Sequence, residues 1–149
     1  MKMSPRGRYG LRVMIELASR FGRGPVGVPA IAGNQGISGK YIHVLMAGLK
    51  SAGLVRAVRG PGGGYELSRD PSGITALDIV SALEGESAPV ECVVDDAFCP
   101  RVGRCAARGV WSSVASAMDG ALSELTLADL ARKELAARKD TLTYHICKM

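Results

Sequence analysis

Residues 36–67 read GISGKYIHVLMAGLKSAGLVRAVRGPGGGYEL, and this stretch decides the fold. Ser38 is a good helix N-cap, and apolar residues then recur at helical spacing until Gly53 stops the pattern. The LVRAVR that follows is alternating and β-branched, which predicts a strand over about residues 54–59. A glycine run and a second short strand come next. The stretch therefore predicts a helix over about residues 39–52, followed by a β-hairpin.

The residues before this stretch predict two more helices. Ser4 and Pro5 suit the N-cap and the first position of a helix over about residues 5–21. Pro29 opens a shorter helix over about residues 29–35. A short helix, a turn with glycine and a longer helix form the helix-turn-helix pattern, although a helix pair that binds no DNA is the alternative. With a β-hairpin behind it, the pattern is that of a winged helix.

In a winged helix-turn-helix, the second helix enters the DNA major groove with its N-terminal residues foremost. A glycine-rich hairpin tip lets backbone N–H groups approach phosphates closely, and arginines beside it supply positive charge. Arginines in the first turns of a helix oppose its dipole, which a bound phosphate would offset. The residues expected to contact DNA are Arg8, Ser38, Gly39, Lys40, Tyr41, His43, Arg56, Arg59, Gly60, Gly62 and Gly63.

The distribution of charge agrees with a polyanionic partner. Residues 1–83 contain 11 Lys and Arg against 4 Asp and Glu, a balance of +7, whereas residues 84–149 contain 8 against 10, a balance of −2. A basic front half favours nucleic acid as its partner, with a solvated basic surface as the alternative.

Composition limits the remaining classes. A chain of 149 residues with 47% hydrophobic and 22% charged residues supports one packed domain, or a small domain with an appended helix. No run of 18 apolar residues is present, and the N-terminus lacks the apolar region of a secretory signal. We therefore expect no membrane contact and a cytoplasmic location. There, the four cysteines favour metal ligands or redox groups over structural disulfides.

Three of the four cysteines lie in residues 91–108, ECVVDDAFCPRVGRCAAR, at the spacing C-x6-C-x5-C. Pro100, Gly103 and the two aspartates predict a loop, which can fold three thiols towards one point. Before it, Thr75 and Asp78 form a capping signal for a helix over about residues 76–84, with Leu77, Val80 and Leu83 inward and Ile79 beside them.

A long helix is expected from about residue 105. Its apolar stripe cannot be buried by one helix alone, and pairing with a second copy would give a symmetric dimer. The stripe consists of Val110, Val114, Ala117, Met118 and Ala121. Thr126 then caps a last helix to about residue 138, and the tail beyond it is expected to fray.

Four features together resemble one family: GRYGLRVMIELA, GISGKYIHVLMAGLKSAGLV, RGPGGGYELSRDPSGITALDIVSALEGE and the three-cysteine spacing. The chain is similar to the IscR/NsrR-type iron–sulfur regulators of bacteria from residue 1 to about residue 130. The resemblance implies a mainly α winged helix-turn-helix with a small β-hairpin wing and a long C-terminal dimerisation helix. It also implies an iron–sulfur cluster on Cys92, Cys99 and Cys105 that modulates binding to a double-stranded DNA operator.

The expected organisation follows from the resemblance and the helix pattern. A winged helix-turn-helix DNA-binding domain occupies residues 1–84, and a cysteine-rich cluster-binding loop occupies residues 85–105. The dimerisation helix and the C-terminal helix share residues 106–138, and residues 139–149 form the tail.

The chain departs from the family pattern in its first cysteine gap, which is one residue longer, and at three single positions. The acid often found in the recognition helix of the cluster-biogenesis regulator is His43 here, and the histidine three residues after its third cysteine is Arg108. The aspartate that the nitric oxide sensors carry in the first helix is Arg8. The fourth ligand is therefore open among Glu91, Asp95, Asp96, His145, Cys147 and an exogenous group. An open fourth position slightly favours [4Fe-4S] over [2Fe-2S].

Two alternatives stay open. The same regulator could use its cysteines as a thiol-redox sensor or a zinc site, although structural zinc sites usually contain a C-x2-4-C pair, which is absent. A small iron–sulfur electron-transfer protein would leave the basic half unexplained. No Ser/His/Asp set or pair of carboxylates indicates catalysis, so we expect no enzyme.

Overall fold

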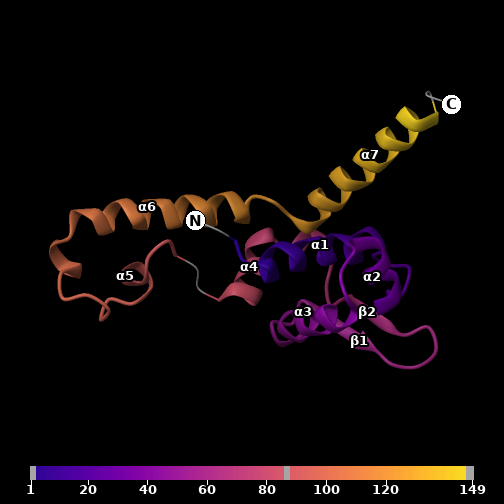
Figure 1. Ribbon diagram of the computed structural model, residues 1–149, viewed down its shortest axis with the longest axis horizontal. Helices are drawn as coiled ribbons and strands as arrows, with labels where there is room; N and C mark the ends of the chain where they lie inside the picture. Colours follow the sequence, from indigo (N-terminus) through magenta and orange to yellow (C-terminus); the bar gives the residue numbers. More distant parts are fainter. Residues whose placement is uncertain (1–2, 86–87, 147–149) are drawn as a thin grey trace.

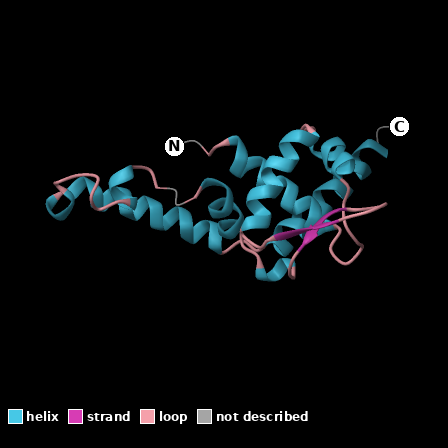
Figure 2. Ribbon diagram, turned by 90° about the horizontal axis from the view of Figure 1, so that it is seen from below, coloured by secondary structure: helices cyan, strands magenta, loops and turns pink. Residues whose placement is uncertain are grey.

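The computed structural model describes residues 3–85 and 88–146, with side chains described as far as Lys139. Helices dominate, and the two strands form one short hairpin (Figure 2). This confirms a mainly α fold with a small β-hairpin. In chain order the elements are α1 (Pro5–Ser19), α2 (Val28–Gln35), α3 (Gly39–Ser51), β1 (Val55–Val58), β2 (Gly64–Leu67), η1 (Pro71–Gly73), α4 (Ala76–Glu84), α5 (Glu91–Val94), η2 (Val102–Arg104), α6 (Ala106–Ser123) and α7 (Leu127–Ile146) (Figure 1).

Three helices begin where their capping residues predict. Ser4 accepts a hydrogen bond from the Arg6 backbone N–H at 3.1 Å, and Ser38 accepts one from the Tyr41 N–H at 3.2 Å. Thr75 and Asp78 form a reciprocal capping box at the start of α4. These local bonds fix where α1, the recognition helix α3 and α4 begin.

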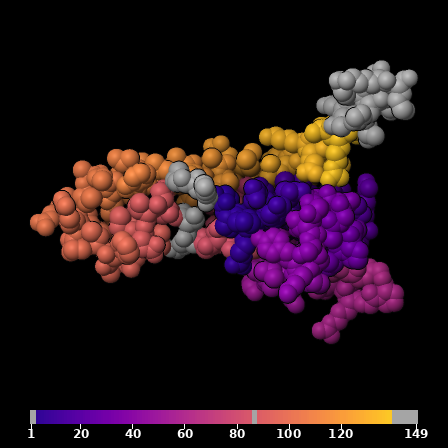
Figure 3. All heavy atoms as spheres, viewed as in Figure 1, coloured from indigo at the N-terminus to yellow at the C-terminus, as the bar shows by residue number. Residues whose placement is uncertain are grey.

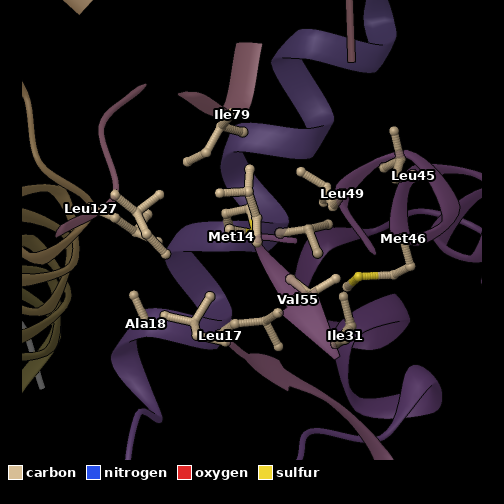
Figure 4. Packing of buried hydrophobic residues seen from close by; sticks show 14 of the residues in the cluster. Met14, Leu17, Ala18, Ile31, Leu45, Met46, Leu49, Val55, Ile79 and Leu127 are labelled. Carbon is tan, nitrogen blue, oxygen red and sulfur yellow. The ribbon is translucent and has the colours of Figure 1, made fainter. Parts of the chain in front are cut away.

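One hydrophobic core joins α1 to α2, α3, α4, the hairpin and the start of α7 (Figure 4). Met14 and Leu17 of α1 lie at its centre, and Leu127 brings in the first turn of α7. On α4, Val80 and Leu83 are buried as expected, but Ile79 is fully buried whereas Leu77 is only half-buried, so the expected stripe was misplaced by one residue at its start. The reason is that Ala76 also packs inward, which turns the buried face towards Ile79.

The hairpin is an antiparallel pair in which Val55 faces Leu67 and Val58 faces Gly64. Behind it, Val26 and Tyr65 exchange both backbone hydrogen bonds, at 2.8 and 3.0 Å. The return strand is therefore fixed between β1 and the segment before α2. We call α1–α4, η1, the hairpin and the first turn of α7 the body of the molecule.

Residues 88–123 form an arm that projects from the body (Figure 3). It consists of α5, η2 and α6, and α5 packs against α6. The chain returns to the body at Thr126, which forms a bridge with Thr75. Ala76 donates to the Leu125 carbonyl at 2.9 Å, and Leu127 donates to the Ile74 carbonyl at 2.8 Å. The arm is therefore fastened to the start of α4 by backbone bonds.

The last helix is longer than its sequence pattern predicts. We expected it to end at about residue 138, with a fraying tail over residues 139–149, but α7 continues through Ile146. Residues 139–146 contain no Gly or Pro, so nothing in the sequence terminates the helix. Cys147, a candidate fourth ligand, lies outside the described residues. No described helix is both long and apolar enough to cross a lipid bilayer.

Candidate DNA-binding surface and cysteine segment

The N-terminal half of α3 presents a polar outer face and an apolar inner face. Ile42 and Leu45 are fully buried, whereas Lys40 and His43 are exposed beside Val44, which is 47% exposed. Polar residues aimed outward from the first turns are what a groove-reading helix requires. Of the other residues expected here, Ser38 is exposed, whereas Gly39 and Tyr41 are half-buried.

Tyr41 is half-buried because its ring meets the ring of Tyr9 edge to face, with centroids 6.1 Å apart. The guanidinium of Arg8 lies 5.0 Å from the centre of the Tyr9 ring, within cation–π range. Arg8 itself is exposed. The structure thus brings an α1 arginine and the start of α3 together through two tyrosines.

A carboxylate of the chain itself offsets the N-terminal dipole of α1. Glu84, at the end of α4, accepts hydrogen bonds from the Ser4 hydroxyl and, at 2.7 Å, from the Gly7 backbone N–H. We expected a bound phosphate to offset the positive charge of the first turns, but Glu84 already lies there. The sequence gives no local sign of this contact, because 77 positions separate the two partners.

The tip of the hairpin requires its glycines. Gly60 and Gly62 have φ angles of 98° and 74°, which other residues rarely adopt. A Cβ on Gly63 would lie 2.3 Å from the Val58 carbonyl oxygen. Arg59 is exposed at this tip, with no ion-pair partner among the described residues. In contrast, Arg56 is bound to Glu66 by an ion pair of 2.8 Å, so its charge is compensated and it is a weaker candidate for a phosphate contact.

His43 and Tyr65 connect the recognition helix to the wing. The His43 Nδ1 atom lies 3.1 Å from the Tyr65 hydroxyl, and the two rings meet edge to face with centroids 6.1 Å apart. Sequence reasoning placed His43 on the DNA side but did not foresee Tyr65 as its partner. Pairing across 22 positions depends on the tertiary fold, so no local signal could have indicated it.

A buried carboxylate joins three helices. Glu16 of α1 is 1% exposed and accepts hydrogen bonds from Asn34 at 2.7 Å, Gln35 at 3.2 Å and Arg138 of α7 at 3.4 Å. Burial raises its pKa, but the hydrogen bonds from Asn34 and Arg138, with the charges of Arg20 and Arg138, outweigh burial and lower the pKa overall. Sequence reasoning missed this residue; an acid inside an apolar helical pattern was the available signal.

The cysteine segment is more ordered than the loop that the sequence predicts. Cys92 lies in α5, Cys99 in the loop and Cys105 at the start of α6, and all three are half-buried free thiols. Among the described residues, no three His, Cys, Asp or Glu side chains lie close enough together to hold a metal ion. The expected loop contains two short helical elements, α5 and η2.

Arg108 holds this segment on α6. Its Nε donates to the Cys92 carbonyl at 2.8 Å, and its guanidinium pairs with Asp96. A guanidinium stays protonated and cannot ligate a metal. The role of Arg108 here is to hold Asp96 and the Cys92 backbone against α6.

The stripe expected to mediate pairing is uncovered in the single chain. Val110 is 60% exposed, Ala117 and Ala121 are exposed, and Val114 and Met118 are half-buried. No residue of α6 is fully buried. The other half-buried positions, such as Ser112 and Ala115, belong to the face that packs on α4 and α5.

Comparison with known proteins places this arrangement in a family. The sequence pattern of the Rrf2 family, described as iron-dependent transcriptional regulators, matches residues 3–133. Protein rrf2 of Nitratidesulfovibrio vulgaris strain Hildenborough is 41% identical over 132 residues, covering 89% of this chain and 88% of that protein.

Two solved structures extend the likeness to the fold. CymR, the global cysteine regulator of B. subtilis, superimposes with a TM-score of 0.75 at 41% identity, covering 89% of this chain and 98% of that one. IscR of T. potens gives a TM-score of 0.74 at 36% identity, covering 90% of this chain and 88% of that one. The sequence match and the fold together confirm the resemblance stated above: the chain belongs to the Rrf2 family of transcriptional regulators.

Proposed function

We propose that this regulator binds a specific DNA operator as a homodimer and that an iron–sulfur cluster on Cys92, Cys99 and Cys105 modulates its affinity. The observation that carries the proposal is the position of the cysteine segment. The three thiols lie on one arm, and the same arm carries the uncovered stripe of α6. A chemical change at the thiols therefore acts on the element that sets the distance between the two recognition helices of a dimer.

The contacts of the arm support this coupling. Arg108 links the Cys92 backbone to α6, and the bonds at Leu125 and Leu127 link the end of α6 to the start of α4. Beyond them, Arg138 of α7 reaches the buried Glu16, which also holds Asn34 and Gln35 at the end of α2. A displacement of the arm is thus carried by hydrogen bonds to the helix that precedes the recognition helix.

The residues of the arm meet the chemical requirement of a cluster. Thiolates are the usual ligands of iron–sulfur clusters, and all three cysteines are free. When bound, a cluster would supply a redox- and ligand-sensitive group at this segment.

The decisive experiment is anaerobic purification followed by an absorbance spectrum and assays of iron and acid-labile sulfide. We expect visible charge-transfer bands with matching iron and sulfide, and loss of both in Cys99→Ser. The dimer and the helical circular dichroism should survive, because none of the three cysteines belongs to the core. A full cluster retained in Cys99→Ser would contradict the three-cysteine site.

A second candidate is thiol sensing without a cluster, which the likeness to the global cysteine regulator CymR supports. It predicts a protein without sulfide whose operator affinity changes on treatment with peroxide and returns with dithiothreitol. Stoichiometric zinc without sulfide would indicate a zinc site instead. These outcomes separate the alternatives on one preparation.

A further inference from the structure

The His43–Tyr65 pair lies on the proposed DNA-binding face and joins its two contacting elements. His43 is exposed on the outer face of α3, and its Nε2 atom has no hydrogen-bond partner among the described residues. Its Nδ1 atom is turned towards the wing, 3.1 Å from the Tyr65 hydroxyl. The pair therefore leaves one ring nitrogen for an external partner and occupies the other.

Tyr65 is held firmly enough to set the orientation of the His43 ring. Its backbone exchanges two hydrogen bonds with Val26, and it also pairs with Ala57 across the hairpin. The side chain is half-buried and packs against the core. The hydroxyl thus occupies a fixed position above α3, and the edge-to-face ring contact limits rotation of the imidazole.

The hydrogen bond also selects the proton position on the ring. In neutral imidazole one nitrogen donates and the other accepts, and the bond made by one nitrogen determines the role of the other. A phenol hydroxyl is a stronger acid than an imidazole N–H, so the favoured arrangement has Tyr65 donating to Nδ1. Nε2 then carries the proton and faces outward as a donor.

We propose that His43, held by Tyr65 in the Nε2–H tautomer, selects guanine at one base pair of the operator. Guanine presents two adjacent acceptors, N7 and O6, at the major-groove edge, whereas cytosine presents a donor there. His43 is the specificity-determining residue and Tyr65 is a positioning residue that acts through it. This inference rests on the proposed function and adds to it the base that the helix recognises.

The test begins with the full-length protein and a pool of random-sequence DNA duplexes, from which bound sequences are enriched and sequenced. One enriched duplex and its single-base-pair variants are then titrated with wild type, His43→Ala, Tyr65→Phe and the double variant. Ser123→Ala serves as the control, because it removes an exposed hydroxyl that bonds to the Gly120 carbonyl at the end of α6, outside the DNA-binding face.

We expect wild type to prefer guanine at one position by about tenfold. Both single variants should lose this preference to the same extent, and the double variant should lose no more. Preferences at the other positions should stay unchanged, and Ser123→Ala should behave as wild type. His43→Asn should move the preference to adenine, whose N6 and N7 suit a side-chain amide.

Three results would overturn the inference while leaving the proposed function intact. They are an undiminished preference in Tyr65→Phe, an undiminished preference in His43→Ala, and a wild-type preference at that position for an A·T base pair in either orientation. Failure to enrich any sequence would instead overturn the proposed function, and this inference with it. The two failures are therefore distinguishable in one set of titrations.

Discussion

Glu16 shows how one ionised side chain can be kept inside a core. A buried carboxylate is costly unless it is paired and hydrogen-bonded, and here Asn34, Gln35, Arg20 and Arg138 supply those contacts. Its lowered folded-state pKa means that the native state favours the charged form. The carboxylate therefore contributes stability above its unfolded-state pKa, and that stability is lost as the pH falls through the folded-state pKa.

We predict that Glu16→Gln lowers the free energy of unfolding at pH 7 by about 2 kcal/mol, because its partners lose a charged acceptor. Urea unfolding at several pH values should show the gap between wild type and variant closing below about pH 4. Glu66→Gln removes a carboxylate from a surface ion pair and should cost at most about 1 kcal/mol. Equal losses in both variants would exclude a special role for Glu16.

At the scale of elements, α1 and α4 approach so closely that glycine is required between them. A Cβ on Gly10 would lie 1.9 Å from the Leu83 Cδ1 atom, whereas a Cβ on Gly33 in α2 would meet nothing within 4 Å. The two glycines are indistinguishable by helix propensity, since each weakens its helix by about 1 kcal/mol relative to alanine. Only tertiary packing separates them.

We therefore predict opposite signs for one substitution at two sites. Gly10→Ala should destabilise the protein by about 1–3 kcal/mol through overpacking against Leu83. Gly33→Ala should stabilise it by about 0.5–1 kcal/mol, because it strengthens α2 without a clash. Thermal unfolding of both variants provides the measurement, and a stabilised Gly10→Ala protein would show that α1 and α4 are less tightly packed.

The difference between local signals and tertiary packing explains which features the sequence could predict and which it could not. The bounds of α3 and α4 and the position of the hairpin depend on caps and glycines, which act within a few residues and leave a local pattern. The end of α7 was predicted too early because residues 139–146 contain no stop signal. A helix that has already formed continues until such a signal is reached. The Glu84 and Tyr65 contacts join residues far apart in the chain, so they depend on packing that composition and periodicity do not encode.

At the scale of the whole molecule, the apolar stripe of α6 is the main surface that a single chain leaves without a packing partner. The stripe lies on the arm, where Val110, Ala117 and Ala121 are exposed and Val114 and Met118 are half-buried. A second copy of the chain, contacting the same stripe by two-fold symmetry, would bury them. This arrangement would also place two DNA-binding faces on one assembly.

We predict that Val114→Asp raises the dimer dissociation constant at least about a hundredfold, because association would bury a charge without a partner. Sedimentation equilibrium measures the effect. Ser116→Asp introduces the same charge on an exposed position of α6 outside the stripe and should leave the dimer intact. A Val114→Asp protein that remains dimeric would remove this stripe from the interface.

The arm leaves the body at one end of α4 and returns at the other, and this has a consequence for protein engineering. The arm departs after Glu84, at one end of α4, and the chain comes back at Leu125, beside the other end. The nine residues of α4 measure about 14 Å, a span that about five extended residues can bridge. If the arm pairs two copies as proposed, transplanting it between relatives should alter the spacing of the two half-sites in the operator, while the bases read within each half-site stay the same.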